Sequence, residues 1–286
     1  MNSPFDILLE PEDKKSIHVA PVKLNEVSGR YRLGPPTRPS IRHDNGFLDK
    51  FRKRAPTAGD RLQFARWLAM LEGSEALCSG GTKTIAPPCQ GEDLSDANAA
   101  YRHFLFGNGA DRTINYERYL LDDASGRQVI PNVLQDFKRH IEVIGHDRVK
   151  FLVTSDAYTI GNGGIAPYPA TVNWQKAIGA HFLWVSANVS VSVVDHSEIL
   201  YTADVTFHME DRYNFNPGQH DIATGIPDSA NGIFEITELA HQYTNYATVQ
   251  RKISWREGEH SGATATGAPT SRQRKPADNR RVRNRI

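Results

Sequence analysis

Apolar residues recur at helical spacing in three segments of the first half of the chain. Residues 59–73 predict a helix with Gly73 just past its end. We expect one apolar face of this helix to be buried, and that face consists of Leu62, Ala65, Leu68 and Ala69. In residues 95–109, Ser95 is the predicted N-cap and Gly107 the stop. Residues 131–145 open with Pro131 in the first turn and are predicted to bury Val133, Leu134, Phe137, Ile141 and Ile144.

From residue 149 onward the apolar period changes to two. Residues 149–161 predict a strand that enters the Gly/Pro-rich loop 161–169. Apolar and polar residues alternate over 184–194 and again over 199–209, so these two runs, joined by a turn at 195–198, predict an antiparallel hairpin with one polar face. We expect a strand end running into a short helix over 234–246 and a last strand over 248–255.

The two ends of the chain lack this periodicity. Residues 1–58 are rich in proline and charge and predict an extended arm. Residues 257–286 lack core-forming side chains and are strongly basic, so we expect disorder there; a solvated end is favoured over contact with anionic lipid or nucleic acid. Between them, 59–256 predict one α+β domain, with helices packed on one side of an antiparallel, open β-barrel-like sheet.

Composition narrows the function classes. The net charge of +1 provides no overall field for nucleic acid, and no apolar run approaches the ~18 residues of a membrane-spanning helix. The first residues lack a basic segment followed by a long apolar one, so the protein is expected to stay in the cytoplasm or to leave without a Sec-type signal.

Cys78 and Cys89 could form a disulfide or remain two free thiols, whereas a metal pair is disfavoured at that spacing.

The stretch 209–232, after the second hairpin strand, is dense in carboxylates and amides. If the odd residues of 199–209 face the core, Glu210 projects from the polar face, and Asp211 lies where the strand stops and the chain turns. Carboxylates and an imidazole at a strand end can bind a hard divalent cation or move a proton. The alternative is an ordinary solvated loop, in which residues 228–232 form a plain turn.

The ten residues DRYNFNPGQH, 211–220, resemble the signature of the colicin M family of bacteriocins. Asp211, Tyr213 and His220 match the family's leading aspartate, its tyrosine and its histidine, and Phe215 and Asn216 match the positions after the tyrosine. Two positions depart from that signature. The family's second aspartate is Asn214 here, and the arginine after its histidine is Asp221. Asparagine cannot act as a base, so Glu210 or Asp221 would have to supply the missing charge.

The resemblance implies hydrolysis of lipid II, the undecaprenyl-linked peptidoglycan precursor, in the periplasm of a target bacterium. It implies a divalent cation (Mg, Ca or Mn), bound here by Asp211 and Glu210, and an immunity protein as partner; peripheral membrane contact is compatible with it. Asp211 would activate water, His220 would act as general acid or base and Tyr213 would position the substrate. Glu210, Asn214, Asn216 and Asp221 would assist with substrate or charge.

Several alternatives stay open. Asn214 and Asp221 favour a non-enzymatic or pore-forming module that binds lipid or protein with the same scaffold, and an unrelated cytoplasmic protein is a third class. His181, His208 and His241 could bind zinc but are more typical of hydrogen-bonded histidines. Trp174, Trp184 and Trp255 could form a platform for sugar or lipid, although core packing is the default.

Overall fold

The computed structural model describes residues 28–79, 89, 91–194, 198–221 and 224–261. Residues 195–197 of the turn predicted at 195–198, the first 27 residues, and residues 262–286 of the predicted basic tail lie outside them. The described helices are a 3-10 turn Ser28–Arg30, α2 Phe47–Lys50, α3 Ala58–Cys78, α4 Ser95–Phe106, α5 Tyr116–Asp122, α6 Gly126–Gly145, α7 Val172–Ala177 and α8 Ser229–Ile236. The strands are β1 Tyr31–Leu33, β2 Arg112–Thr113, β3 Lys150–Ser155, β4 Tyr158–Ile160, β5 His181–Val194, β6 Glu198–Tyr213 and β7 Tyr243–Arg256.

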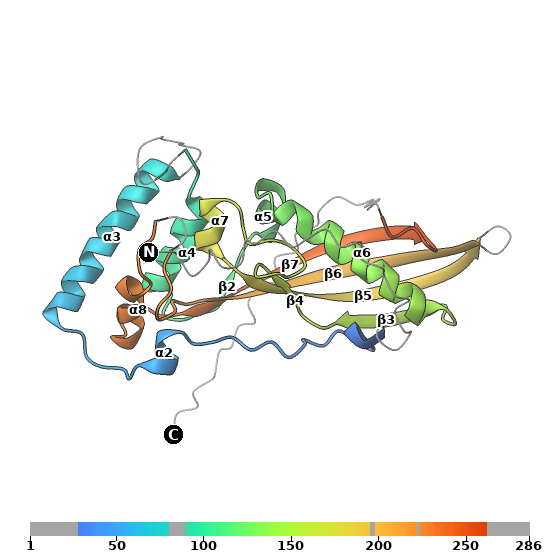
Figure 1. Cartoon of the computed structure of the whole chain (residues 1–286), viewed down its shortest axis with the longest axis horizontal. Coiled ribbons are helices and arrows are strands. Elements are labelled where there is room, and N and C mark those ends of the chain that lie inside the picture. Colours follow the sequence, from blue (N-terminus) through green and yellow to red (C-terminus); the bar gives the residue numbers. More distant parts are fainter. Residues whose placement is uncertain (1–27, 80–88, 90, 195–197, 222–223, 262–286) are drawn as a thin grey trace, which may run out of the picture.

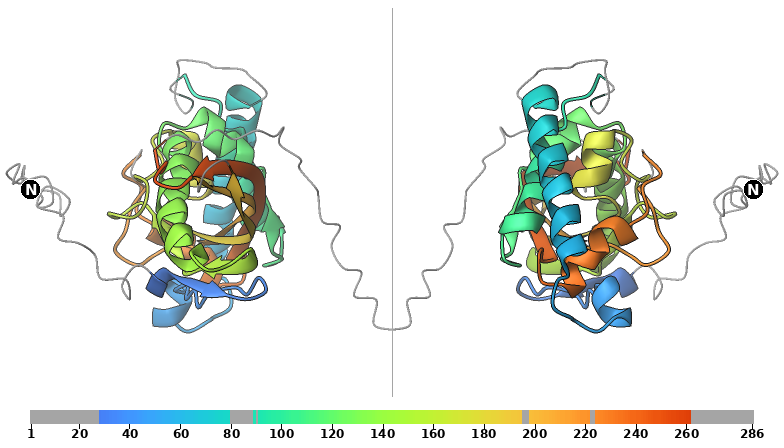
Figure 2. Two further views of the ribbon diagram at one scale, coloured as in Figure 1. Left: turned by 90° about the vertical axis from the view of Figure 1, so that its right-hand side faces the viewer. Right: turned by 90° about the vertical axis from the view of Figure 1, so that its left-hand side faces the viewer.

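The strands form one sheet in the order β1-β3-β5-β6-β7-β2, with β4 paired to β5 beside β3. All described pairs are antiparallel except the short parallel pair β2–β7. Helix α6 runs along the sheet, while α3, α4, α7 and α8 gather at one end (Figure 1); the right-hand view of Figure 2 looks onto that end. The predicted α+β class is confirmed, but the sheet is not closed into a barrel.

The predicted hairpin is confirmed, and its strands are longer than the alternation indicated. β5 and β6 pair in register from Phe182–Glu210 to Val194–Glu198. The odd residues of β6 point into the main core, as expected: Tyr201, Ala203, Val205, Phe207 and Met209 are all buried. Because β6 continues to Tyr213, Asp211 lies within the strand and not where it stops.

The helix predictions hold in part. Helix α6 buries Val133, Leu134, Phe137 and Ile141 as expected, although it begins at Gly126, so Pro131 is inside the helix instead of in its first turn. Helix α4 ends at Gly107 as predicted, but its N-cap is Leu94 and not Ser95.

The buried face of α3 was predicted wrongly. Leu62 is 56% exposed, and Ala65 and Ala69 are exposed as well. Of the four predicted residues only Leu68 packs inward, and it does so together with Phe64, Trp67 and Leu71 against the cluster of α4 and α8. Apolar residues lie on both sides of this helix, so the pattern alone does not choose between the faces. The helix also continues past Gly73 to Cys78, which forms a disulfide with Cys89.

Two further expectations need correction. In 234–246 the order is reversed, because Phe234 lies in α8 and the strand β7 follows from Tyr243. The described part of the N-terminal arm is not merely extended, since β1 pairs with β3 at the sheet edge. No helix within the described residues is long and apolar enough to cross a membrane.

Candidate functional site

Glu210 and Asp211 are neighbours in β6 and point to opposite faces of the sheet. Glu210 Oε2 accepts a hydrogen bond from Arg38 Nε at 2.7 Å, and its Oε1 lies 2.6 Å from His43 Nε2. Burial disfavours its charge, but these two partners outweigh that cost and lower the pKa of Glu210 to about 2. Glu210 therefore ties the segment before α2 to the sheet, and it does not share a site with Asp211.

Asp211 faces the helical end of the core and is only 4% exposed. Asn245 lies opposite it in β7 and donates a hydrogen bond from Nδ2 to Asp211 Oδ2 at 2.9 Å. Burial disfavours the ionised carboxylate more than Asn245 and the nearby Arg212 favour it, so the pKa of Asp211 rises to about 8. A carboxyl group with such a pKa can give or take a proton near neutral pH.

Tyr168 is a half-buried phenol on which the charges of three nearby aspartates act. Its pKa is raised to about 12, first by burial and then by the charges of Asp211, Asp221 and Asp228. The ring is held by two close approaches to glycine backbone: a Cβ on Gly161 would lie 3.2 Å from Tyr168 Cδ2, and one on Gly179 would lie 3.2 Å from Tyr168 Oη. We call the group that surrounds this phenol the Tyr168 cluster; it comprises Tyr168, Lys176, Asp211, His220, Asp221 and Asp228.

Lys176 supplies positive charge to the Tyr168 cluster. It lies in the last turn of α7 and forms an ion pair with Asp221 Oδ2. The other oxygen of Asp221 accepts hydrogen bonds from the backbone and side chain of Thr224. Burial opposes ionisation of Asp221, but Lys176 and Thr224 outweigh it and hold its pKa below the usual range.

His220 and Asp228 come together where the loop after β6 closes. An isolated bridge pairs His220 with Pro227, and Asp228 accepts the backbone N–H of Asn216 at 2.9 Å. Burial is the main cause of a raised pKa at Asp228; the charge of Asp221 raises it further and His220 lowers it. The side chain of His220 is exposed to solvent. Asp228 lies at the N-cap of α8, which replaces the plain turn expected at 228–232.

The remaining residues of the signature have structural partners. Tyr213 lies on the same face as Asp211, two residues away, and stacks on Tyr243 with ring centroids 5.1 Å apart. Asn214 donates a hydrogen bond to the backbone carbonyl of Asp44, and a second to its carboxylate. Asn216 contributes the backbone N–H that Asp228 accepts. Asn214 therefore tethers the loop to the segment before α2 and does not join the Tyr168 cluster.

Glu235 is a buried carboxyl group that the sequence did not single out. Its Oε1 accepts the backbone N–H of Phe215 at 3.1 Å, while its Oε2 has no hydrogen-bond partner among the described residues. Burial, together with the charges of Asp228 and Asp44, raises its pKa to about 8 against the opposing effects of Phe215 N–H and Arg212. Through its hydrogen bond to Phe215 N–H, Glu235 stabilises the loop after β6.

The histidines and tryptophans noted in the sequence have separate partners. His181 is buried against Tyr116, and His208 stacks on Trp184 with centroids 3.6 Å apart. Trp174 and Trp255 belong to the core, as the default interpretation predicted. Across the described parts of the chain, no group of three or more His, Cys, Asp or Glu side chains is arranged to hold a metal ion.

The charges of Asp211, Asp221 and Asp228 thus all act on one phenol, and His220 lies next to Asp228 through its bridge to Pro227. Of the predicted site residues, Glu210, Tyr213, Asn214 and Asn216 are not part of the cluster: Tyr213 stacks on Tyr243, and Asn216 contributes only its backbone N–H to Asp228. The sequence interpretation missed Tyr168 and Lys176, which come from the loop and helix before β5. Gly161 and Gly179 flank that segment, and both have a positive φ. These two glycines were the feature of the sequence that could have drawn attention to it.

Comparison with known proteins adds little to this geometry. No protein-family model and no curated protein matches the sequence. Among solved structures, the chain has a distant likeness to PaeM, a colicin M-like bacteriocin produced by Pseudomonas aeruginosa. The sequence identity is 15% and the TM-score 0.36, over 57% of this chain and about half (52%) of that one. A likeness at this level carries no argument about fold or function, so the proposal below depends on the residues themselves.

Proposed function

We propose that this chain is an antibacterial toxin of colicin M type that hydrolyses a phosphate ester of lipid II. The observation that carries the proposal is the Tyr168 cluster, in which Asp211 has a pKa of about 8 beside two further aspartates. The signature 211–220 supports it, because its leading aspartate is this same Asp211. The substrate, the delivery route without a Sec signal, the action in the target periplasm and the immunity protein all follow from the resemblance and are part of the proposal.

In the proposed reaction, Asp211 is the proton acceptor for the attacking water. With a pKa of about 8 it is ionised in about half of the molecules at pH 8, and the ionised form can accept a proton. The phenol of Tyr168 stays protonated at that pH and can donate a hydrogen bond to a phosphoryl oxygen. In this proposal His220, exposed beside Asp228, donates a proton to the leaving group.

The expected divalent cation stays a prediction. Glu210 and Asp211 point to opposite faces of the sheet, so they cannot both bind one ion. The described residues do not offer a set of three ligands either. No step of the proposed reaction therefore passes through a metal, and dependence on Mg, Ca or Mn is a separate question for the assay.

The test is release of pyrophosphoryl sugar from purified lipid II, with and without chelator. Asp211→Asn keeps the size and the hydrogen-bonding shape of the side chain but cannot accept a proton, so turnover should be lost. Asp204→Asn is the matched control, because Asp204 lies exposed on the same strand. Turnover by Asp211→Asn at the wild-type rate, or none by the wild-type protein in any cation, would overturn the proposal.

A second candidate is a non-enzymatic module that binds lipid. The observation that favours it is the exposure of two large apolar side chains on α3, Leu62 and Met70. Sedimentation with lipid vesicles free of lipid II distinguishes this candidate: binding that Leu62→Gln weakens, without turnover of lipid II, would support it over the enzyme.

A further inference from the structure

Asp123 is a carboxylate at the junction of α5 and α6, and none of its surface is exposed to solvent. Its Oδ1 accepts the backbone N–H of Ser125 at 2.8 Å. Its Oδ2 accepts both the backbone N–H and the hydroxyl of Thr171, each at 2.8 Å. The backbone N–H of Ala170 lies 3.0 Å from Oδ2 and 3.1 Å from Oδ1. Asp123 therefore joins the start of α6 to the segment that enters α7.

These donors keep the carboxylate of Asp123 ionised. Burial disfavours the charged form, but the N–H groups of Thr171, Ala170 and Ser125 and the Thr171 hydroxyl outweigh it and lower the pKa of Asp123. A donor that moved away would leave part of a buried charge without compensation, which is costly. The carboxylate thus holds the backbone of Ala170 and Thr171 in place.

The segment that Asp123 holds also carries Tyr168. Ser125, which follows Asp123 by two residues, donates a hydrogen bond from Oγ to the carbonyl oxygen of Pro167. The backbone before Tyr168 is therefore bound through Ser125, and the backbone after it is bound through Asp123 at Ala170. The junction of α5 and α6 consequently fixes the chain on both sides of the phenol.

The same hydrogen bonds fix the start of α7. Thr171 is the N-cap of this helix, and its hydroxyl oxygen accepts the backbone N–H of Trp174 at 3.5 Å. Lys176, which forms the ion pair with Asp221, lies in the last turn of the same short helix. Both Tyr168 and Lys176 are thus attached to backbone that Asp123 holds.

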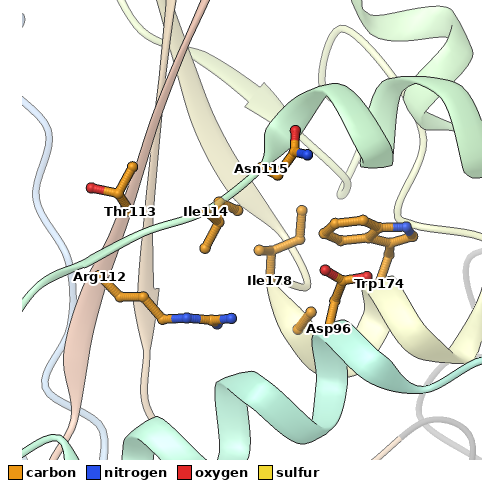
Figure 3. A pocket seen from close by; sticks show the side chains of 8 residues that line it. Asp96, Arg112, Thr113, Ile114, Asn115, Trp174 and Ile178 are labelled. Atoms are coloured by element: carbon orange, nitrogen blue, oxygen red, sulfur yellow. The ribbon is translucent and has the colours of Figure 1, made fainter. Parts of the chain in front are cut away.

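Packing around α7 is incomplete on one side. A pocket of about 100 Å³ lies between β2, α4 and α7, and Trp174 and Ile178 border it (Figure 3). Its lining contains one carboxylate, Asp96, and one guanidinium, Arg112, so its charge favours neither an anion nor a cation. Atoms that face an empty space lose the contacts that would otherwise hold them. The position of α7 therefore depends more strongly on the hydrogen bonds at its start.

We propose that Asp123 is a positioning residue for the Tyr168 cluster, because it fixes both the backbone next to Tyr168 and the first turn of the helix that carries Lys176. Since Asp123 is fully buried, it acts through these residues and not on the substrate. The inference rests on the proposed function, because the positions of Tyr168 and Lys176 matter to turnover only if the cluster is the active site.

The first arm of the test follows the phenol of Tyr168 without substrate. ¹³C NMR of protein with labelled tyrosine Cζ reports its ionisation, and the resonance is assigned by its loss in Tyr168→Phe. With a pKa of about 12, the wild-type phenol should be about one tenth ionised at pH 11. Asp123→Ala releases the segment and exposes the phenol, so its pKa should fall toward the ordinary 10.0 and most of it should be ionised at pH 11.

Asp122→Ala is the matched control, because Asp122 is the last residue of α5 and its side chain is 56% exposed. This variant loses the same charge and should match the wild type. Far-UV circular dichroism at pH 11 checks that each protein is folded. If Asp123→Ala does not fold, Asp123→Asn replaces it; this variant keeps one acceptor oxygen, so the ionised fraction should lie between those of the wild type and Asp122→Ala on one side and free tyrosine on the other.

A folded Asp123 variant in which Tyr168 ionises as in the wild type would overturn the proposal, and so would an equal change in Asp122→Ala. A residue that only stabilises the fold would lower the free energy of unfolding and leave the phenol of the folded protein unchanged.

The second arm measures lipid II turnover. Asp123→Ala should lower kcat about tenfold or more, because small misplacements of catalytic groups are costly. Wild-type turnover by a variant whose phenol has shifted would also overturn the proposal. If the wild-type protein has no turnover but the phenol shifts as expected, the proposed hydrolysis fails while Asp123 still fixes the cluster. If the wild-type protein turns over lipid II and the phenol does not shift, this inference alone fails.

Discussion

Two adjacent carboxylates of β6 have pKa values that are shifted in opposite directions. Glu210 is 2% exposed and Asp211 is 4% exposed, yet the pKa of the first is lowered to about 2 and that of the second is raised to about 8. Burial opposes ionisation in both. Glu210 overcomes it with the Arg38 guanidinium and the His43 ring as partners, whereas Asp211 has an amide donor as its hydrogen-bond partner.

The contrast shows that partners, more than burial, decide what a buried carboxylate can do. On one face the strand uses its carboxylate as an anchor for the segment before α2. On the other face it keeps a carboxyl group poised between protonated and ionised forms beside Tyr168. The four predictions that follow test this difference between structural and reactive roles.

The largest expected effect is on activity. Asp211→Asn should lower the rate of lipid II hydrolysis about 100-fold or more, since positioned proton transfer contributes that much in other enzymes. Glu210→Gln should change the rate far less, provided that the protein remains folded at the assay temperature. Equal losses in the two variants would contradict the division of roles.

The next effect is on stability. Glu210→Gln removes the anion that Arg38 and His43 share, so it should lower the free energy of unfolding by about 2 kcal/mol at pH 7. Since the folded pKa lies below the ordinary 4.5, this contribution is present above pH 4.5 and is lost as pH falls toward 2. Urea unfolding at several pH values measures it, with Asp204→Asn as the exposed control; a penalty that does not shrink on acidification would argue against the ion pair.

The opposite pH dependence is expected at Asp211. Between its ordinary pKa of 3.8 and the folded value of about 8, the unfolded chain ionises this group and the folded chain does not, so it costs stability as pH rises. Asp211→Asn should therefore be more stable than wild type at pH 8 and no more stable at pH 4. Thermal unfolding at both pH values checks the sign of the difference.

The smallest effect concerns the position of Tyr168. Gly179→Ala should cost about 1 kcal/mol of stability because its φ is +55°, and it should also lower activity because the new Cβ lies 3.2 Å from Tyr168 Oη. Gly163→Ala has a similar φ of +75° with no atom within 4 Å, so it should cost stability alone. Identical activities in the two variants would remove Tyr168 from the site.

Much of the sheet could be predicted from the sequence because its signal is local. The alternation in 184–194 and 199–209 fixes which side chains share a face, and the 3.6-residue spacing in α6 fixes its buried side. The face of α3 could not be predicted, since Leu62 and Phe64 begin two competing apolar stripes. The packing of α4 and α8, which are distant in sequence, decides between them.

Some residues of the candidate site could likewise be predicted from the sequence, and others could not. Asp211, Asp221 and His220 lie within one short motif, so the sequence could group them. Tyr168 and Lys176 reach the same place from before β5, and no local pattern shows that approach. The extension of β6 to Tyr213 had the same effect: it moved Asp211 from an expected loop into a buried strand position, and this burial accounts for its altered pKa.

The most direct test of the account is the pKa of Asp211 itself. A ¹³C-carboxyl NMR titration of the folded protein, with the resonance assigned by its loss in Asp211→Asn, measures it without any substrate. The account predicts a midpoint near 8, with Glu210 remaining ionised down to about pH 2. A midpoint for Asp211 at or below its ordinary value of 3.8 would contradict it.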